Sequence, residues 1–486
     1  METNEIAKGA QYREAEQELL KLLKEVDGLE EGDLKGLEQT IYQGIFDIGR
    51  KIMEGRMRKR QESEPVPTTL QGACGHQQIL VSYRSKKLLT LFGEVQWKRA
   101  YYQCQVEADP EPAQAAKCSH GRVPADETWG VQGTRTSPGV QQYISYLCAM
   151  LTLEEAAESF RRLLPLRMSA RQALNLMQPV GQALARREDE AVKALFEQAA
   201  KSQASQEQAV QQSSKDIARF YIELDGILAR MRRGSVPMEE EERKRQGDVY
   251  REMKVGAVFL GERGPERSEL APEVWVDTPK ADSLRYVARR TAKGGFGPLL
   301  YTLAVQCGLN RAKQVVVLGD GAPWIWKLVG EHFPGAVEIV DLYHAQEHVW
   351  EVARAVFGPS RQEASIWAKQ ACTLLVHGRI EDLVTAIGQL PKIPPAPEES
   401  RSVPDKAVDY FTTNAARMRY PAFRAQGMHV GSGIAEAACK TVVETRAKRA
   451  GMRWTPEGLD ALLPLRTAKL NHTYDEFWEQ QSRLVA

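Results

Sequence analysis

The spacing of hydrophobic and polar residues changes several times along this chain, and each change predicts a different kind of element. Apolar residues recur at helical spacing between residues 11 and 60, at Leu19, Leu20, Leu23, Val26, Ile41, Ile45, Ile48 and Ile52. Short alternating runs follow from about 67 to 130, where "LTLFGEVQWKRAYYQC" predicts a hairpin. Helical spacing returns from about 137 to 196. We therefore predict an N-terminal helical region (1–66), a small β module (67–135) and a second helical region (136–196).

The second helical region has the outline of a helix-turn-helix. Thr152 is a candidate N-cap for a first helix and Ser169 for a second, with a short turn between them. The second helix would present Arg171, Gln172 and Asn175 to DNA, although an ordinary helical hairpin accounts for the same pattern. The basic run "RKIMEGRMRKR" near residue 55 leaves a similar choice between a solvated helix end and a contact with the DNA backbone.

The second half of the chain predicts an α/β domain at 217–486, after a Gln- and Ser-rich segment at 197–216 that is either a linker or a solvated helix. "FYIELDGILARM" and "YREMKVGAVFL" predict a strand pair, "EVWVDT" a third strand, and "QVVVLGDG" and "AVEIVDLYH" two buried strands. We interpret the segment from "DSLRYVARR" to "AVQCGL" as a helical crossover, 351–425 as a helical insertion, and about 432–450 as the last long helix. The fold class is multidomain α+β, with a mixed sheet covered by helices on both faces.

Composition adds few constraints. The chain has 486 residues, 65 basic and 64 acidic side chains and seven cysteines. A net charge of +1 names no partner, so local clusters must carry any argument for nucleic acid. We find no signal peptide and no apolar run long enough for a membrane span, and an odd number of scattered cysteines favours a reducing compartment, so we expect a cytoplasmic protein.

Two aspartates stand where apolar strands meet glycine: Asp225 in "FYIELDG" and Asp320 in "VVVLGDG". A single acid in such a place usually caps the following turn, but ligands of α/β sheets bind at the carboxyl ends of the strands. Glu436 opens a helix in "GSGIAEAACKTVVETRAKRAGMRW", among small residues and before a basic stripe. An acid on such a face would suit a metal ion beside a phosphate backbone.

These acids, "LGDGAPWIW" and above all the "GSGIAEAACKTVVETRAKRAGMRW" stretch resemble the ISKra-type bacterial insertion-sequence transposases, which are similar to Mutator-like DDE enzymes. The resemblance extends from about residue 70 to "LLPLRTAKLN" near the end. It implies an RNase H-like catalytic domain in which Asp225, Asp320 and Glu436 hold two Mg²⁺ or Mn²⁺ ions. The separations are 95 residues between the aspartates and 116 to the glutamate, and the second interval has room for a helical insertion. Two metal ions activate the attacking oxygen and stabilise the leaving one.

The same resemblance implies roles for two further clusters. Asp341 and His344 match an acid-x-x-His pattern near the DNA or the active site, and with His348 they share one helix face that could bind a metal, although a structural hydrogen-bonded pair is equally consistent. Relatives carry two Cys-x-x-Cys pairs in the β module, but here only Cys74, Cys104 and Cys118 remain, with His120 or His76 as a fourth Zn²⁺ ligand. The alternative is a zinc-ribbon-like module that has lost its metal.

The sequence therefore predicts a transposase that binds the DNA ends of its element and cleaves and joins strands. We expect DNA as the partner, a homo-oligomer as the family implies, and phosphate contacts from Arg446, Lys448, Arg449 and Arg453. An ordinary solvated helix face is the alternative for these basic residues, and only their adjacency to Glu436 favours DNA binding. Two other functions stay open: a different RNase H-like nuclease such as a resolvase, and a transposon-derived DNA-binding protein without catalysis.

Overall fold

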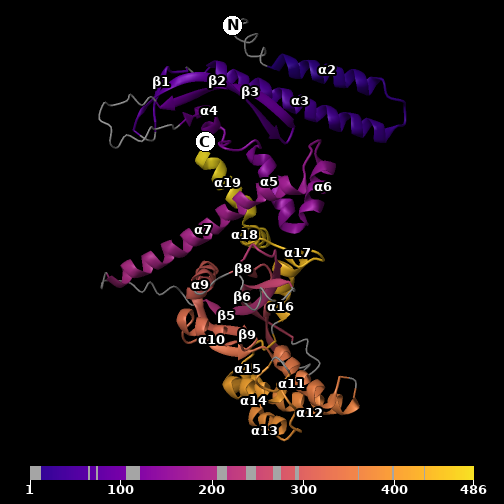
Figure 1. Cartoon of the computed structure of the whole chain (residues 1–486), viewed down its shortest axis with the longest axis vertical. Coiled ribbons are helices and arrows are strands. Elements are labelled where there is room, and N and C mark those ends of the chain that lie inside the picture. The colour runs from indigo at the N-terminus through magenta and orange to yellow at the C-terminus, as the bar shows by residue number, and fades with distance from the viewer. Residues whose placement is uncertain are drawn as a thin grey trace. The chain divides into compact units, whose positions relative to one another are not determined.

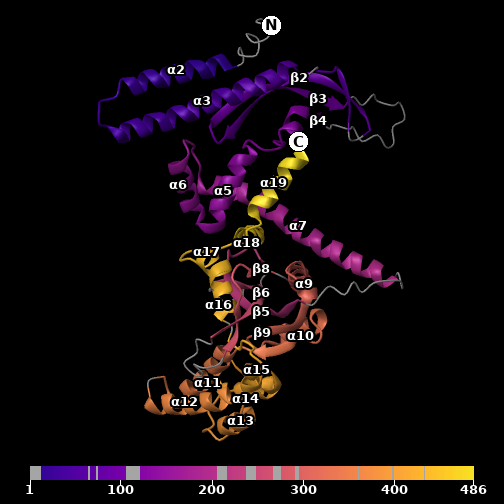
Figure 2. The same cartoon turned by 180° about the vertical axis from the view of Figure 1, so that it is seen from behind.

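The computed structural model describes residues 12–63, 66–72, 75–104, 121–204, 216–236, 248–265, 275–290, 295–359, 361–396, 399–431 and 433–485. The chain divides into two compact units. Unit 1 comprises residues 1–180 with 474–486, and unit 2 comprises residues 181–473. Figures 1 and 2 show the chain from opposite sides.

Unit 1 begins with a helical hairpin. The predicted helix at 11–60 is two helices, α2 (Arg13–Asp27) and α3 (Leu34–Ser63), because "GLEEGD" between them breaks the helix. Gly32 has a φ of 95°, a left-handed backbone conformation that residues with a Cβ rarely adopt. Leu22 of α2 is buried and packs against Gly44 of α3, where a Cβ would clash with the leucine methyl groups. The absence of a side chain at Gly44 therefore allows the two helices to approach closely.

The β module of unit 1 is a four-stranded antiparallel sheet in the order β1-β2-β3-β4. The predicted hairpin is confirmed as β2 (Gln77–Thr90) and β3 (Gly93–Cys104), which are flanked by β1 (Thr69–Gln71) and β4 (Gly121–Arg122). Its core consists of Met57, Leu88, Val95, Trp97 and Val131. α3 contributes Met57 to this core, so the N-terminal helices and the β module fold as one body.

The helices that follow in unit 1 are α4 (Pro124–Thr128), α5 (Pro138–Met150), α6 (Leu153–Leu163) and the start of α7 (Ala170–Ala204); α19 (Tyr474–Val485) returns to this unit. Both predicted caps are confirmed. Thr152 and Glu155 form a reciprocal capping box at α6, and Ser169 Oγ accepts the backbone N–H of Gln172 at 3.2 Å. The Gln172 side chain is itself part of this cap, because its Oε1 accepts the Ser169 N–H at 2.9 Å. α7 continues to Ala204, so the solvated-helix interpretation applies to the first part of 197–216; residues 205–215 lie outside the described ranges.

Unit 2 is built on a mixed sheet whose strands follow the order β10-β9-β5-β6-β7, with β8 also pairing with β6. β5 (Ile217–Met231) and β6 (Val249–Pro265) are antiparallel, whereas β9 (Ala312–Gly319) and β10 (Val337–Val340) run parallel to β5. The predicted strands are therefore confirmed, and so is the change from antiparallel to parallel pairing.

The prediction for the segment after β7 (Trp275–Pro279) was wrong in its first part. "RYVAR" forms β8 (Arg285–Arg289), and helix begins only at α9 (Phe296–Gln306). β8 pairs with β6 over Lys254–Val258, next to the stretch of β6 that pairs with β7. Backbone groups of the long β6 therefore form hydrogen bonds with "RYVAR" and hold it as a strand. The pattern of the segment itself does not reveal this pairing.

Alternation along the strands divides unit 2 into two cores. One face carries Phe220, Ile222 and Leu224 of β5 and is covered by α9, the short η2 (Leu309–Arg311) and α10 (Pro323–His332). Trp324 and Trp326 at the start of α10 pack against this core. The opposite face carries Tyr221 of β5 and belongs to the second core.

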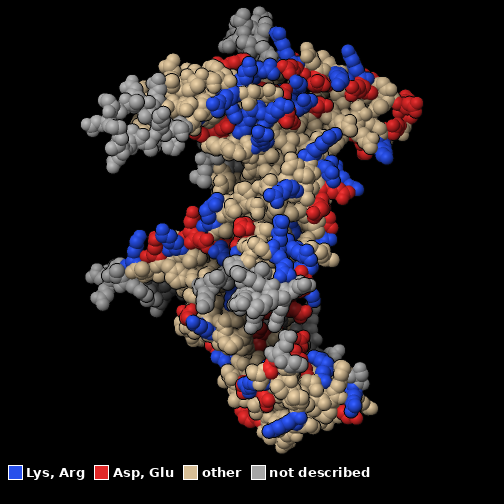
Figure 3. Space-filling model, viewed as in Figure 1, with Lys and Arg blue, Asp and Glu red and all other residues tan. Residues whose placement is uncertain are grey.

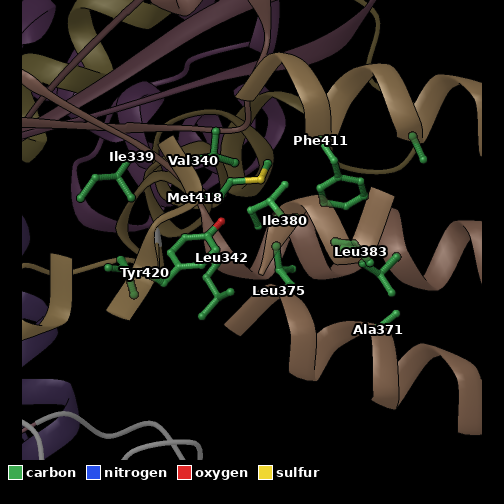
Figure 4. Packing of buried hydrophobic residues seen from close by; sticks show 14 of the residues in the cluster. Ile339, Val340, Leu342, Ala371, Leu375, Ile380, Leu383, Phe411, Met418 and Tyr420 are labelled. Carbon is green, nitrogen blue, oxygen red and sulfur yellow. The ribbon is translucent and has the colours of Figure 1, made fainter. Parts of the chain in front are cut away.

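The helical insertion covers that second face. It comprises α11 (Leu342–Phe357), α12 (Gln362–Val376), α13 (Ile380–Gly388), α14 (Val403–Asn414), η3 (Ala415–Met418) and α15 (Tyr420–Ala425). Figure 4 shows side chains from these helices gathered around the end of β10 and the start of α11, including Ile339, Val340, Leu342, Leu375, Ile380, Phe411, Met418 and Tyr420. The insertion therefore shares a continuous core with the sheet.

The predicted helix at about 432–450 is confirmed as a continuous helical run from Gly433 to Ala447, in which α16 (Gly433–Ala438) continues into a π-helical segment η4 (Cys439–Glu444) and then α17 (Thr445–Ala447). Such π segments are often found at functional sites. This run is not the last long helix, because the long buried helix α18 (Pro456–Leu470) at the end of unit 2 and then α19 follow it. No helix in the described ranges is long and apolar enough to cross a lipid bilayer.

Candidate active site

Three aspartates form a row across the parallel part of the unit 2 sheet. Leu224 of β5 pairs with Gly319 of β9, and Gly319 pairs with Val340 of β10. The next residue on each strand is an acid: Asp225, Asp320 and Asp341. Adjacent strands lie about 4.8 Å apart, so the register itself brings Asp225 and Asp320 close together. Side chains along each strand alternate between the two faces of the sheet, and this alternation places Asp225 and Asp320 on the face that the helical insertion covers.

Asp225 is half-buried, and its carboxylate is fixed by two hydrogen bonds. Oδ1 accepts the backbone N–H of Gly226 at 2.6 Å, and Oδ2 accepts the thiol of Cys439 at 3.3 Å. Burial raises the pKa of Asp225, and the nearby charge of Asp320 raises it further, while the Cys439 hydrogen bond opposes the change. Two acids thus share an edge where their charges repel.

Asp320 is held by the turn that follows β9. Its Oδ1 accepts the N–H of Ala322 at 2.8 Å, and its backbone carbonyl accepts the hydroxyl of Tyr410 from α14 at 2.8 Å. Gly321 has a φ of 97°, and a Cβ there would clash with the Tyr410 ring. The aspartate-glycine pair therefore allows the insertion to close tightly on the end of β9. Among the described residues, no Lys or Arg forms an ion pair with Asp225 or Asp320.

Glu436 lies on α16, one helical turn before Cys439, whose thiol contacts Asp225. Its backbone is therefore close to the aspartate pair, but its side chain is 75% exposed and pairs with Lys440 at 3.2 Å. Within the described ranges, no three His, Cys, Asp or Glu side chains form a group that could hold a metal ion. In this conformation the site thus offers two neighbouring carboxylates, Asp225 and Asp320, and a third acid that is turned away.

The donor set of the aspartate pair nevertheless suits a hard cation. Mg²⁺ is usually bound through one or two carboxylates while it keeps several waters. Asp320 Oδ2 accepts no hydrogen bond from the described residues, and a cation would relieve the repulsion that raises the pKa of Asp225. Asp225 and Asp320 are therefore the residues of this edge that fit a divalent metal.

The residues of the predicted second cluster, Asp341, His344 and His348, make different contacts. Asp341 is buried and caps α11, because its Oδ1 accepts the N–H groups of Tyr343 at 2.6 Å and His344 at 3.3 Å. His344 lies close enough to Asp225 for a positive charge on its ring to favour the ionised carboxylate. His348 packs on the Tyr410 ring with the centroids 4.2 Å apart and contacts Glu351 through Nδ1. Asp341 thus has a structural hydrogen-bonding role, and His344 faces the aspartate edge.

Glu223 is a residue of this region that sequence reasoning missed. It is two residues before Asp225 on the same face of β5 and has no exposed surface. Its Oε2 accepts the N–H of Ala435 at 2.7 Å, and its Oε1 lies 3.9 Å from His429 Nε2. Glu223 therefore ties β5 to the helix that carries Glu436. An acid inside the apolar run "FYIEL" was the signal that could have identified it.

Burial raises the pKa of Glu223 well above that of an ordinary glutamate, with a further contribution from Asp341, while the Ala435 hydrogen bond lowers it. The folded protein therefore binds this proton more tightly than the unfolded chain does. Protonated Glu223 therefore contributes fully to stability below the ordinary glutamate pKa, and this contribution is lost as the pH rises toward the raised pKa of the folded protein.

We expect the stability of Glu223→Gln, which cannot ionise, to increase relative to that of the wild type as the pH rises from 5 to 8. The gain should be about 1 kcal/mol or more, the equivalent of one pKa unit. Thermal melts of both proteins at the two pH values measure it, with the exposed Glu331→Gln as control. A constant difference between Glu223→Gln and wild type at both pH values would show that Glu223 is ionised throughout.

The basic residues near α17 divide into one buried and three accessible side chains. Arg446 is 0% exposed, and its guanidinium lies 5.2 Å from the centre of the Trp454 ring. The prediction that Arg446 contacts DNA phosphate is therefore corrected, because a cation without exposed surface cannot reach a phosphate in this conformation. Lys448 pairs with Glu444 at 3.0 Å, Arg453 is 56% exposed and 3.6 Å from Asp248, and Arg449 is exposed.

The cysteine module is described only in part. Cys74, Cys118 and His120 lie outside the described residues. Cys104 at the end of β3 is buried, and its Sγ accepts a hydrogen bond from Gln78 Nε2 at 3.4 Å. The zinc hypothesis therefore stays a prediction.

Unit 2 is thus a mixed α/β domain in which an acidic edge formed by β5 and β9 faces a helical insertion. No family model matches the sequence, and no curated protein matches it. Among solved structures, the chain is similar to a chain of the Drosophila P element transposase strand transfer complex, with 10% identity, coverage of 73% of this chain and 83% of that chain, and a TM-score of 0.21.

Proposed function

We propose that this protein is a DDE transposase of a bacterial insertion sequence, which binds the ends of its element and cleaves and joins DNA strands. One observation carries the proposal. Asp225 and Asp320 follow paired positions on adjacent parallel strands, and no Lys or Arg among the described residues neutralises either of them. Such an arrangement is costly unless it serves to bind a cation.

The strand order supports the RNase H-like domain that the resemblance implies. Four strands joined by antiparallel pairing, β5 to β8, are followed by two strands, β9 and β10, that run parallel to β5. Asp225 stands on β5, and Asp320 directly follows β9. The helical insertion separates the second aspartate from Glu436, as expected from the 116-residue interval. The proposal therefore agrees with both the sheet and the order of the acids along the chain.

Asp225 and Asp320 would hold Mg²⁺ or Mn²⁺, with Glu436 as a third ligand. When bound, such ions activate the attacking oxygen and stabilise the leaving one in phosphodiester cleavage. The chain's own groups orient the carboxylates: the Cys439 thiol holds Asp225, and the Tyr410 hydroxyl holds the backbone of Asp320. Lys448, Arg449 and Arg453 are the accessible candidates for contacts with DNA phosphate.

A second function, a DNA-binding protein without catalysis, is favoured by one observation. Glu436 is turned to solvent and paired with Lys440, so the three acids are not grouped. In that case the aspartate pair would have a structural role, and the protein would bind DNA without cleaving it.

We expect the full chain, with Mg²⁺ or Mn²⁺, to nick DNA that carries the ends of its element and to join precleaved ends to a second DNA. Denaturing gels of labelled ends measure both reactions, with unrelated DNA of equal length as control. Nicking without joining would identify a different RNase H-like nuclease such as a resolvase. Tight binding of the ends without either reaction would support the non-catalytic alternative.

A further inference from the structure

The α2–α3 hairpin of unit 1 carries an apolar face that the described residues leave largely exposed. Its two helices pack on each other through buried residues such as Ala15 and Leu22. A different set of large apolar residues stays between 38% and 67% exposed within the described part of the chain: Leu19, Leu20, Leu23, Leu34, Ile41, Ile45 and Ile52. Tyr42 is 45% exposed as well, but its hydroxyl donates to the Leu163 carbonyl. Contiguous apolar surface of this kind is rare on monomers and usually belongs to an interface.

The spacing of these residues is that of a coiled-coil seam. On α3, Leu34, Ile41, Ile45, Ile48 and Ile52 are separated by seven, four, three and four residues. On α2, Leu19, Leu23 and Val26 continue the same three-four alternation. Side chains at these intervals line one side of a helix and insert between those of a facing helix. The pattern therefore predicts that another helical surface packs here.

Both seams lie on the same side of the hairpin. Leu22 and Gly44 face each other where the helices touch. Successive residues of a helix are rotated by about 100° about its axis. On α2 this places Leu19 and Leu23 about 60° and 100° from the direction of Leu22. On α3 it places Ile41 and Ile45 about 60° and 100° from the direction of Gly44. Because the helices are antiparallel, equal rotations in the two helices point to the same side. The exposed residues thus form one continuous face.

The charges on the hairpin suggest which surface covers this face. Its tip is acidic, with Asp27, Glu30, Glu31 and Asp33 around the turn. The far end of α3 carries the basic residues Arg56, Arg58, Lys59 and Arg60. Arg58 pairs with Glu14 of α2 at 3.0 Å, so Arg56 and Lys59 are the charges that a partner would meet. Figure 3 shows acidic side chains gathered at the tip and basic ones where α3 runs along the sheet. The hairpin therefore complements a second hairpin placed in the opposite direction.

We propose that the α2–α3 faces of two copies of this chain pack antiparallel and form a symmetric dimer through a four-helix seam. Ile45 lies midway in sequence between Glu31 and Lys59. An antiparallel pair centred on Ile45 therefore sets the acidic tip of each copy against the basic end of the second copy, and the apolar residues of the two hairpins meet between these ends. A two-fold axis produces both contacts at once. The dimer is independent of the proposed catalytic function.

The first test is the mass of the full-length protein in solution, measured by light scattering during size exclusion at micromolar concentration. We expect the wild type to be a dimer and Ile45→Lys to be a monomer, because a charge would be buried in the seam. Ile366→Lys is the matched control, since Ile366 is 50% exposed on α12 of unit 2. Circular dichroism and thermal melts check that each variant folds. A monomeric wild type, or a folded Ile45→Lys that stays dimeric, would overturn the proposal.

The second test addresses the direction of pairing. One variant carries Glu30→Lys and Glu31→Lys at the tip, and another carries Arg56→Glu and Lys59→Glu at the basic end. Each alone should dissociate at least tenfold more readily than the wild type, because like charges meet at both ends. An equimolar mixture should recover a mixed dimer with near wild-type affinity, and added salt should weaken the charge effects. Failure of the mixture to recover would rule out the antiparallel arrangement.

Discussion

We expect Asp320→Asn to abolish metal-dependent cleavage of the element's ends, with a loss of about a thousandfold or more, since a metal in such a site supplies several kcal/mol of stabilisation. The change removes one charge and almost no volume. Oδ1 of the asparagine can still accept the Ala322 N–H, and the Tyr410 contact uses only the backbone carbonyl. The fold and the binding of DNA should therefore be preserved. Gel cleavage assays and binding titrations at fixed salt measure the two properties separately.

Asp382→Asn is the matched control, because Asp382 is an exposed acid in the same unit. It should cleave like the wild type. Equal activity of Asp320→Asn and wild type would remove Asp320 from the metal site. A variant that cleaves normally at raised Mn²⁺ but poorly in Mg²⁺ would support a ligand role, because it would show weakened metal binding.

The second large effect is expected from Arg446→Ala. Loss of a wholly buried guanidinium removes its packing on Trp454 and leaves a cavity in the interior, which should destabilise unit 2 by about 3 kcal/mol. Denaturant unfolding, monitored by tryptophan fluorescence, measures this change. DNA affinity should fall only as far as the fraction of folded protein falls.

Arg453→Ala is the contrasting variant, since Arg453 is 56% exposed. Its free energy of unfolding should stay within about 0.5 kcal/mol of the wild type. If Arg453 contacts a phosphate, DNA binding should weaken for all sequences, and the salt dependence should lose about one counterion. The reverse result, in which Arg446→Ala is stable and binds DNA poorly, would return Arg446 to the DNA surface.

Much of the fold was predictable from local pattern. The strands β5, β6, β9 and β10 each contain a run of apolar residues, and the caps at Thr152 and Ser169 are short-range signals. β8 was missed because its strand conformation depends on pairing with distant β6. The π-helical segment after α16 was missed for a related reason. Its widened turn coincides with the contact of Cys439 with Asp225 on β5, which no periodicity within the helix reveals.

The sequence by itself determined which acids stand at the ends of apolar strands, because an acid that interrupts a buried run is visible without coordinates. It also determined the three-four spacing of the apolar residues along α2 and α3, since spacing is a property of the chain. Only the tertiary structure decided that Asp225 and Asp320 share an edge, that Glu223 is buried beneath α16, and that Arg446 is enclosed while Arg453 is not. The reason is physical: burial and charge pairing depend on neighbours far away in sequence, and folding alone brings those neighbours together.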